Sequence, residues 1–194
     1  LAALIAIPFS YSSPDAYVQT NVTGTLNVLQ SARRHSVEHL VCTSTSETYG
    51  TAQFVPISES HPLNAQSPYA ATKVASDQMA LAFHRSFNMP VSILRPFNTF
   101  GPRQSARAVI PTVIGQIASG QKEIKLGSLH PTRDFTFVAD TSRGFIQIMN
   151  TDRCFGEVAN IGTGHEISIG ETVELLSDLM GVSVAVIQDN LRER

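Results

Sequence analysis

Apolar residues recur at helical spacing over the first part of the chain, between Pro14 and Arg34. They stand at Val18, Val22, Leu26, Val28, Leu29 and Ala32. Ser13 followed by Pro14 predicts an N-cap and a first helical turn. The next stretch, His39 to Thr43, is short and rich in Leu and Val, which is typical of a strand buried on both faces of a parallel sheet. Helix, strand and loop in this order indicate a βαβ arrangement.

The same rhythm returns in the middle of the chain. Ser67 and Pro68 open a helix predicted to run to Phe87, and the VSILR run at 91–95 is predicted to be the next parallel strand. After Gly101 the elements become shorter. We predict helices over 108–120, 141–149 and 171–181, and strands over 123–126, 134–138, 157–162, 166–170 and 182–187. The fold class is therefore α/β: the later part of a doubly wound parallel sheet, followed by a smaller mixed α/β lobe.

The chain has 194 residues, of which 42% are hydrophobic, and this is enough for a well-buried core. Its net charge of -2, with no long run of Lys or Arg, provides no electrostatic footprint for nucleic acid or an anionic membrane. The opening apolar stretch ends at Phe9 and is too short to cross a bilayer. The two cysteines, Cys42 and Cys154, argue against a disulfide framework and favour a reducing, cytoplasmic location. No histidine has metal-ligand spacing, so we expect no metal.

A polar octapeptide, TSTSETYG, follows the first predicted strand and spans Thr43 to Gly50. Ser and Thr clusters often form turns that hydrogen-bond to their own backbone, and this is one interpretation. The other is that the carboxyl end of a parallel strand is where α/β proteins place their chemistry. The octapeptide alone favours the turn, so the choice depends on residues elsewhere in the chain.

Tyr69 and Lys73 lie four residues apart at the start of the second long helix. Side chains at this spacing share one helical face, with roughly 5 to 6 Å between their Cβ atoms. A neighbouring ammonium favours the phenolate, so we expect Lys73 to lower the pKa of Tyr69 from its reference value of about 10 and to make it a base. A solvated surface pair is the alternative. Because the polar octapeptide ends a strand just before this helix, Thr45, Tyr69 and Lys73 are predicted to meet at one strand end.

Four motifs occur in order along the chain: STSETYG, SPYAATK, RPFNTFGPRQ and RDFTFVAD. Together they are similar to the motifs of the extended short-chain dehydrogenase/reductase family, the NAD-dependent epimerases, dehydratases and decarboxylases of sugar nucleotides. The resemblance implies a Rossmann-like sheet, NAD as cofactor, a nucleotide sugar such as a UDP-sugar as substrate, and a homodimer. The dimer would form through the helices predicted over 14–34 and 67–87.

The resemblance also implies a role for each residue of the predicted site. Tyr69 would be the base that takes the proton of the sugar 4-hydroxyl, and Thr45 would hydrogen-bond to the same hydroxyl. Lys73 would hold the nicotinamide ribose and lower the pKa of the tyrosine. Glu47 corresponds to the carboxylate with which 4,6-dehydratases remove the C5 proton, once the 4-keto group has acidified it. A loop carboxylate facing water is the alternative for Glu47.

Position 46 leaves the reaction open. Many similar dehydratases carry Asp before the Glu, as the acid that protonates the departing 6-hydroxyl, whereas this chain has Ser46. Thr-Ser-Glu also occurs in UDP-glucuronate decarboxylases, and 4-epimerases do not require the carboxylate of Glu47. The strings IPFSYSSPDAYVQTNVTGTLNVLQ and PFNTFGPRQSARAVIPT resemble more closely the dehydratases of nucleotide-linked N-acetylglucosamine in legionaminic-acid and related pathways. We therefore expect a 4,6-dehydratase of a UDP-N-acetylglucosamine-like substrate, acting through a 4-keto intermediate.

Further contacts follow from the same resemblance. Ser46, Asn98 and Arg133 are expected at the nucleotide sugar, where the planar, charged arginine suits the diphosphate. A surface pair with Asp134 is the alternative for Arg133. The residues expected to line the cofactor, besides Tyr69 and Lys73, are Ala2, Ala3, Pro96 and Phe97, with Leu1 beside the alanines.

The Gly-rich turn that receives the NAD pyrophosphate in this family has no match in the chain. We therefore expect a fragment that is truncated at both ends. Residues 1–103 would be the C-terminal part of the NAD-binding Rossmann domain, without its first βαβ unit. Residues 104–194 would be an incomplete substrate lobe, with some segments returning to the Rossmann sheet. A second hypothesis, from another class, is a non-catalytic fragment that retains only sugar-nucleotide binding.

Overall fold

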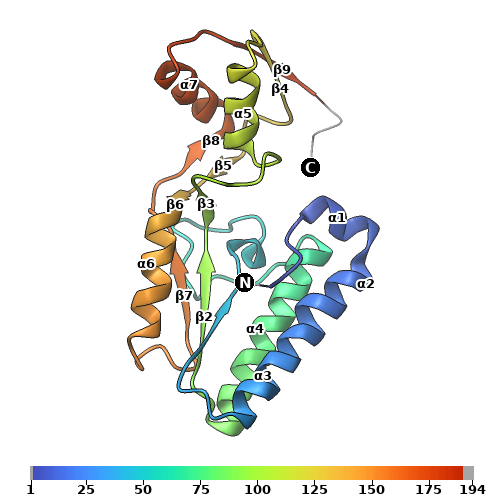
Figure 1. The fold of residues 1–194 in the computed structure, drawn as a ribbon, viewed down its shortest axis with the longest axis vertical. Coiled ribbons are helices and arrows are strands. Elements are labelled where there is room, and N and C mark those ends of the chain that lie inside the picture. Colours follow the sequence, from blue (N-terminus) through green and yellow to red (C-terminus); the bar gives the residue numbers. More distant parts are fainter. Residues whose placement is uncertain (1, 190–194) are drawn as a thin grey trace. The chain divides into compact units, whose positions relative to one another are not determined.

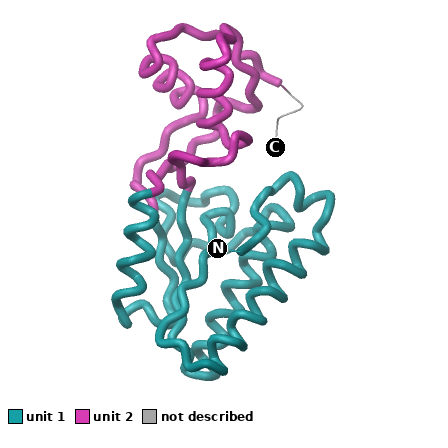
Figure 2. Tube along the Cα trace, in the orientation of Figure 1, with its two compact units in different colours: residues 1–97, 139–161 teal, residues 98–138, 162–194 magenta. Residues whose placement is uncertain are grey.

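The structure, a computed structural model, describes residues 2–189 (Figure 1). Helices and parallel strands alternate along the chain, so the predicted α/β class is confirmed. The chain divides into two compact units (Figure 2). The first contains the residues up to Phe97 and the segment Ala139–Ile161, and the second contains Asn98–Val138 and the residues from Gly162 onward.

A three-stranded parallel sheet forms the centre of the first unit. Its strands are β1 (Leu40–Thr43), β2 (Val91–Pro96) and β7 (Val158–Ile161), in the order β1-β2-β7. Leu40 pairs with Val91, and Ile93 pairs with Val158. The carboxyl ends of all three strands therefore lie at one edge of the sheet. The middle strand is buried from Val91 to Arg95, as expected for its apolar run, and the charge of Arg95 is buried with it.

The helix predicted over Pro14 to Arg34 is present as one continuous helical run. It consists of α2 (Pro14–Tyr17), a π-helical turn (Val18–Thr23) and α3 (Gly24–Arg34). The predicted N-cap is wrong, since the Ser13 side chain makes no capping hydrogen bond, although Pro14 occupies the first turn. A short helix, α1 (Ile7–Ser12), precedes this run and escapes the sequence pattern, because six residues are too few to show a helical period.

α4 (Pro68–Phe87) is the second predicted long helix and connects β1 to β2. Ser67 is its N-cap: the hydroxyl accepts a hydrogen bond from the Ala70 amide at 3.1 Å, and Pro68 fills the first helical position. The helix ends at Asn88, whose left-handed backbone (φ 51°) stops the helical hydrogen bonding. The cap fixes the first turns of α4, which carry Tyr69 and Lys73.

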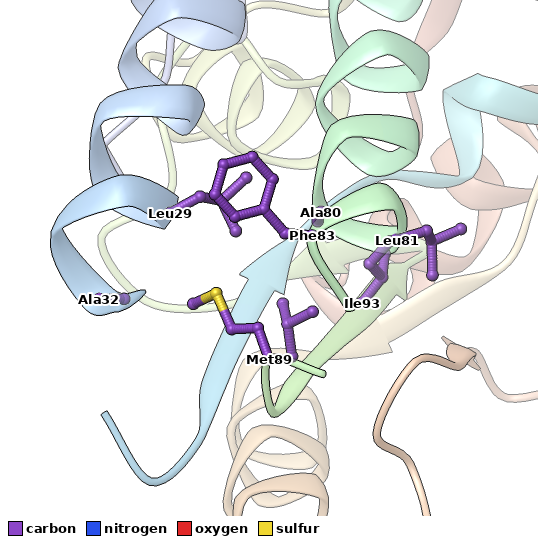
Figure 3. Packing of buried hydrophobic residues seen from close by; sticks show 8 residues of the cluster. Leu29, Ala32, Ala80, Leu81, Phe83, Met89 and Ile93 are labelled. Carbon is purple, nitrogen blue, oxygen red and sulfur yellow. The ribbon is translucent and has the colours of Figure 1, made fainter. Parts of the chain in front are cut away.

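The core of the first unit lies between the sheet and the paired helices α3 and α4 (Figure 3). Leu29 of α3, Phe83 of α4 and Ile93 of β2 belong to one cluster of buried side chains. The other buried members are Ala32, Ala80, Leu81, Met89 and Val91. This cluster fixes α4 on the sheet and so places the N-terminal turns of α4 near the carboxyl end of β1.

α6 (Val138–Met149) lies on the other side of the sheet (Figure 1). It begins at Val138 rather than at the predicted residue 141. Gly144 lets it approach β7 closely, because a Cβ there would come within 1.9 Å of the Ile161 side chain. The sheet is therefore covered on both sides, as is typical of parallel sheets.

The second unit consists of strand pairs and helices around a smaller core. The parallel pairs join β3 (Asn98–Phe100) to β6 (Phe135–Phe137) and β4 (Glu123–Leu126) to β9 (Ala185–Gln188), and the antiparallel pair joins β5 (Thr132–Arg133) to β8 (Ile167–Ser168). The helices are α5 (Val109–Ala118) and α7 (Ile169–Leu179). The buried core residues are Val113, Ile117, Ile124, Leu126 and Val173. The division of the chain at residue 103 into cofactor and substrate parts stays a prediction.

The core of the first unit allows a test by truncation. Ile93→Ala shortens a side chain that is 0% exposed between sheet and helices, so it is expected to lower the free energy of unfolding by about 3 kcal/mol. Val28→Ala, on α3 with its side chain 53% exposed, is the control, with an expected change below about 0.5 kcal/mol. Urea denaturation followed by circular dichroism measures both. Equal losses in the two variants would contradict this assignment of the core.

Candidate active site

The polar octapeptide forms a tight turn directly after β1. Ser44 still belongs to the sheet, since its amide donates to the Leu94 carbonyl at 2.7 Å. Thr45 then begins a 3-10 helix over Ser46–Tyr49, and its hydroxyl accepts a hydrogen bond from the Glu47 amide at 3.2 Å. The interpretation as a turn thus holds for the backbone, while side chains of the same residues reach α4.

Gly50 ends this turn in a backbone conformation that other residues avoid. Its φ is +65°, and a Cβ would lie 2.2 Å from the Asn64 carbonyl oxygen. The Asn64 amide in turn donates to the Thr48 carbonyl at 3.0 Å. The glycine therefore lets the following loop close against the turn that carries Thr45 and Glu47.

The structure brings Tyr69 and Thr45 together. Tyr69 lies in the first turn of α4 and is 7% exposed. Its phenol is hydrogen-bonded to the Thr45 side chain. Tyr17 of α2 packs edge-on against the Tyr69 ring, with 6.2 Å between the ring centroids. The contacts on both sides hold the phenol beside the threonine hydroxyl.

Burial raises the pKa of Tyr69 to about 12. The hydrogen bond from Thr45 lowers this pKa, while the negative charges of Glu47 and Asp77 and the neighbouring Tyr17 raise it further. The expectation that Lys73 lowers the pKa of Tyr69 is therefore wrong for the residues of this chain. The expectation left out the cost of burying a phenolate, and Lys73 is not among the groups that act on the pKa of Tyr69.

Lys73 lies one turn after Tyr69 on α4 and is 7% exposed. Its ammonium donates to the Thr43 carbonyl at 2.5 Å. Burial lowers the pKa of Lys73, and the carboxylate of Asp77 acts in the opposite direction. Within residues 2–189 the Thr43 carbonyl is the one hydrogen-bond partner of an ammonium that has three donors, so the others can bind ligand hydroxyls such as those of a ribose. The residues at this point therefore fit a nucleotide cofactor.

A buried polar network that the sequence pattern did not predict supports these residues. The Asp77 carboxylate accepts hydrogen bonds from the Ser44 hydroxyl at 2.7 Å and from Arg95 at 2.9 and 3.0 Å. Arg95 also donates to the Tyr49 hydroxyl at 3.0 Å, and that hydroxyl donates to the Asn160 side chain at 2.7 Å. One signal was available, because Arg95 is the only charge in the apolar run VSILR and a buried charge requires a partner.

Asn21, in the π-helical turn, connects the N-terminal segment to α4. Its side chain accepts a hydrogen bond from the Leu4 amide at 2.9 Å and donates to the Leu4 carbonyl at 3.0 Å. It also donates to the Thr72 hydroxyl of α4 at 3.1 Å. The chain is thereby fixed next to Ala2, which is exposed, and Ala3, which is half-buried.

Other predicted site residues of the first unit follow the strand ends. Ser46 and Glu47 form the start of the 3-10 helix and are half-buried. Pro96 ends β2, and the Phe97 amide donates to the carbonyl that ends β7 at 2.8 Å. Leu1, which we expected beside the alanines, lies outside the described residues.

Two predicted substrate contacts, Asn98 and Arg133, lie in the second unit. Asn98 begins β3, and its amide donates to the Asp134 carbonyl at 3.1 Å. Arg133 is exposed, and its guanidinium donates to the carbonyl of the preceding residue at 2.7 Å. The Asp134 carboxylate accepts hydrogen bonds from the Thr163 and Gly164 amides at 2.9 and 2.8 Å. Among the described residues Asp134 makes no ion pair with Arg133, so that alternative is wrong.

Within residues 2–189 no group of three or more His, Cys, Asp or Glu side chains is arranged to hold a metal ion. No helix in this part of the chain is long and apolar enough to cross a membrane. Burial raises the pKa of the Cys42 thiol to about 11, so this cysteine stays protonated and is a poor nucleophile.

The sequence has relatives whose families and names are known. It matches the model of the GDP-mannose 4,6 dehydratase family over residues 1–193. A dTDP-glucose 4,6-dehydratase of Streptomyces antibioticus is 34% identical over 186 residues, which cover 96% of this chain and 55% of the relative. The chain thus spans little more than half the length of that enzyme.

Solved structures resemble the fold closely. A dTDP-glucose 4,6-dehydratase of Streptomyces venezuelae, solved with NAD bound, is 32% identical with a TM-score of 0.88, over 100% of this chain and 62% of the other. A UDP-N-acetylglucosamine 4-epimerase of Methanobrevibacter ruminantium M1, in complex with UDP-N-acetylmuramic acid, is 29% identical with a TM-score of 0.90, over 100% of this chain and 64% of the other. The chain covers less than two thirds of each.

The negative charges near Tyr69 predict how its pKa changes when one of them is removed. Glu47→Gln removes a negative charge that acts on the phenol, so the pKa of Tyr69 is expected to fall below its value of about 12. The pH dependence of the phenolate absorbance, taken as the difference from a Tyr69→Phe variant, measures this pKa. Glu38→Gln is the control, since Glu38 is exposed and does not act on the phenol. A pKa at the ordinary value of 10.0 in the unsubstituted chain would contradict the described burial.

Proposed function

The chain belongs to the GDP-mannose 4,6 dehydratase family of NAD-dependent nucleotide-sugar dehydratases and epimerases, and on this premise we propose that its site catalyses a 4,6-dehydration. The observation that carries the proposal is the hydrogen bond between Tyr69 and Thr45, next to the half-buried Glu47. Two neighbouring hydroxyl groups suit one sugar hydroxyl, and a carboxylate suits the acidic C–H beside it. The substrate of the whole protein would be a nucleotide-linked hexose.

Oxidation at C4 is the first step. Tyr69 takes the proton of the 4-hydroxyl, and the Thr45 hydroxyl holds the same oxygen in place. Lys73 would hold the ribose hydroxyls of NAD through the donors that the Thr43 carbonyl leaves open. NAD would supply the acceptor of the C4 hydride and, after water is lost, the donor of that hydride to C6, while C5 regains a proton. Because the pKa of Tyr69 is about 12, positive charge bound close to the phenol is needed to bring it toward neutral pH.

Elimination of water is the second step. The 4-keto group acidifies the C5 proton, and Glu47 takes that proton as the C5–H bond breaks. The C6–O bond then breaks, and the departing hydroxyl needs a proton to leave as water. Ser46 is a poor acid for this transfer, because a serine hydroxyl holds its proton far more tightly than a carboxylic acid does. The proton that Glu47 has taken is therefore the one that leaves with the C6 oxygen.

Two other reactions of the same family are alternatives, because they pass through the same 4-keto sugar. A UDP-uronate can lose CO2 from that intermediate, and a 4-epimerase returns the hydride to the other face of C4. Neither reaction needs an acid at Ser46. A UDP-N-acetylglucosamine-like substrate is the finer proposal, and the name of the Methanobrevibacter epimerase, at 29% identity, supports it.

Contacts to the ligands are proposed for further residues. Ser46, Asn98 and Arg133 would contact the nucleotide sugar, and the exposed guanidinium that Asp134 does not engage suits a diphosphate. The residues that would line NAD, with Tyr69 and Lys73, are Ala2, Ala3, Pro96 and Phe97. A cytoplasmic homodimer formed through the helical run from α2 to α3 and through α4 completes the proposal.

Product mass and two substitutions test the proposed reaction in the protein that contains this chain. With UDP-N-acetylglucosamine we expect a product lighter by one water. Tyr69→Phe is expected to slow the appearance of NADH absorbance by roughly 100-fold or more, because it removes the base. Glu47→Gln is expected to keep NADH formation within about tenfold and to stop exchange of the C5 proton with deuterated solvent, because it removes only the second base.

The outcomes of this experiment distinguish the dehydratase from the decarboxylase and the epimerase. Loss of CO2 from UDP-glucuronate would indicate the decarboxylase, and an unchanged product mass would indicate the epimerase. Full activity of Tyr69→Phe would refute the base assignment. Glu38→Gln, an exposed carboxylate, is the control for the loss of a negative charge.

Calorimetry distinguishes an enzyme from a module that only binds nucleotide sugars. The 194-residue chain is titrated separately with NAD+ and with UDP-N-acetylglucosamine. Arg133→Ala is expected to weaken binding of the nucleotide sugar roughly tenfold, as loss of a charged hydrogen bond does, while Lys122→Ala, an exposed cation of the same unit, leaves it unchanged. Binding of the sugar nucleotide without NAD+ would favour the binding module. Equal affinity in both variants would rule out the role of Arg133.

A further inference from the structure

We propose that the buried ion pair of Asp77 and Arg95 positions the active-site turn, defined as residues 44–49, against the helix that carries Tyr69. The inference deepens the proposed function and rests on it, since the turn matters to the reaction through Thr45 and Glu47. Asp77 and Arg95 act through these residues and are positioning residues. They lie on different elements, α4 and β2, and are joined by a hydrogen-bonded contact of 2.9 Å.

The ion pair holds the start of the active-site turn through Ser44. The Ser44 hydroxyl, on a residue that is 4% exposed, donates to Oδ2 of Asp77 at 2.7 Å. The same oxygen accepts hydrogen bonds from Nε and Nη2 of Arg95 at 3.0 and 2.9 Å. Because Ser44 directly precedes Thr45, the hydrogen bond between Ser44 and Asp77 fixes the backbone position from which the Thr45 side chain extends to Tyr69.

The ion pair holds the end of the turn through Tyr49. Nη1 of Arg95 donates to the Tyr49 hydroxyl at 3.0 Å, and Cζ of Arg95 lies 4.9 Å from the centroid of the Tyr49 ring. The Tyr49 hydroxyl donates in turn to the Asn160 side chain at 2.7 Å, and Tyr49 is 0% exposed. With both ends bound to the same pair, the residues between them, which include Glu47, keep one arrangement.

The partner of the turn is one face of α4. Tyr69, Lys73 and Asp77 follow each other at intervals of four residues, so they lie on the same side of a single helix. The helix is capped at Ser67 and packed in the core of the unit. The place of Asp77 along α4 therefore determines the place of the turn relative to Tyr69.

Burial of Asp77 and Arg95 restricts the conformations that the active-site turn can adopt. Asp77 is 1% exposed and Arg95 is 2% exposed, and two charges removed from water are costly unless all their hydrogen bonds are made. An apolar pair of equal volume would fill the same space and would accept several conformations of the turn. A charge pair that must keep both Ser44 and Tyr49 as hydrogen-bond partners allows few conformations of the turn. The pair therefore contributes precision at the site rather than stability alone.

Single hydroxyl deletions test the proposal while leaving the ion pair in place. Ser44→Ala removes one partner of the pair, and Tyr49→Phe removes the other partner and keeps the buried ring. Ser92→Ala is the matched control, because Ser92 is 0% exposed on β2 and bonds to Cys154 and His39 instead of the turn. All three variants lose one buried hydroxyl, so a general loss of stability affects them alike.

Hydrogen exchange tests whether the pair holds the turn. In Ser44→Ala and Tyr49→Phe the amides of Glu47 and Thr48 are expected to exchange roughly fivefold faster than in the unsubstituted chain, because a hydrogen bond that kept the turn closed is lost. Ser92→Ala is expected to leave these amides unchanged. This readout needs no substrate, so it is independent of the reaction. Equal exchange in all the variants and the unsubstituted chain would overturn the proposal.

Kinetics in the protein that contains this chain tests whether holding the turn matters for catalysis. Ser44→Ala and Tyr49→Phe are expected to lower kcat roughly tenfold, with KM for the nucleotide sugar changed less than about twofold, because misplaced groups lose rate more than binding. Losses of kcat no larger than that of Ser92→Ala would overturn the positioning role. If the unsubstituted protein converts no nucleotide sugar, the proposed function fails, and hydrogen exchange alone decides whether the pair holds the turn.

Discussion

The carboxylate of Asp77, two turns after Tyr69 on α4, and the guanidinium of Arg95, on the middle strand of the sheet, form an ion pair that is buried from water. Asp77 and Arg95 are both nearly fully buried, so every donor and acceptor near them is constrained to complete their hydrogen bonds. Ser44 follows β1 and Tyr49 ends the 3-10 helix, and both bind this pair. One interaction therefore connects α4, the end of β1 and β2, and the arrangement of the site depends on it.

The same carboxylate has opposite effects on the two other groups of its helical face. Asp77 raises the pKa of Lys73 against the larger, lowering effect of burial, and it raises the pKa of Tyr69, which opposes the phenolate. With a pKa of about 12, Tyr69 is a neutral phenol beside Lys73. Such a phenol is a hydrogen-bond donor until positive charge arrives. The basicity of Tyr69 thus depends on what is bound next to it, and the proposed proton abstraction would occur only in a filled site.

The parts of the structure that sequence reasoning predicted are those set by local chemistry. The Ser67 cap, the length of α4 and the shared face of Tyr69 and Lys73 depend on residues within a few turns of each other. What it could not predict depends on residues brought together by the fold. The pKa of Tyr69 is raised mainly by burial, which no spacing reveals. Ser13 has the composition of a cap, but its side chain makes no capping bond. Strands such as β5, with two residues, are too short to produce a period.

In the proposed reaction, the chemistry after C4 oxidation would depend on two neighbouring residues of the 3-10 helix, Ser46 and Glu47. Such a helix turns by about 120° per residue, so the side chains of positions 46 and 47 point in different directions. An acid at position 46 would therefore serve the C6 oxygen while Glu47 serves C5, and Ser46 removes that division. Among the described residues the Glu47 carboxylate accepts no hydrogen bond, although the backbone of Glu47 is held in the turn. Its carboxylate oxygens therefore stay open to accept the C5 proton, which Glu47 would pass to the C6 oxygen in the proposed dehydration. A turn with a fixed backbone and a carboxylate without a hydrogen-bond donor together suit a dehydration with one acid–base group.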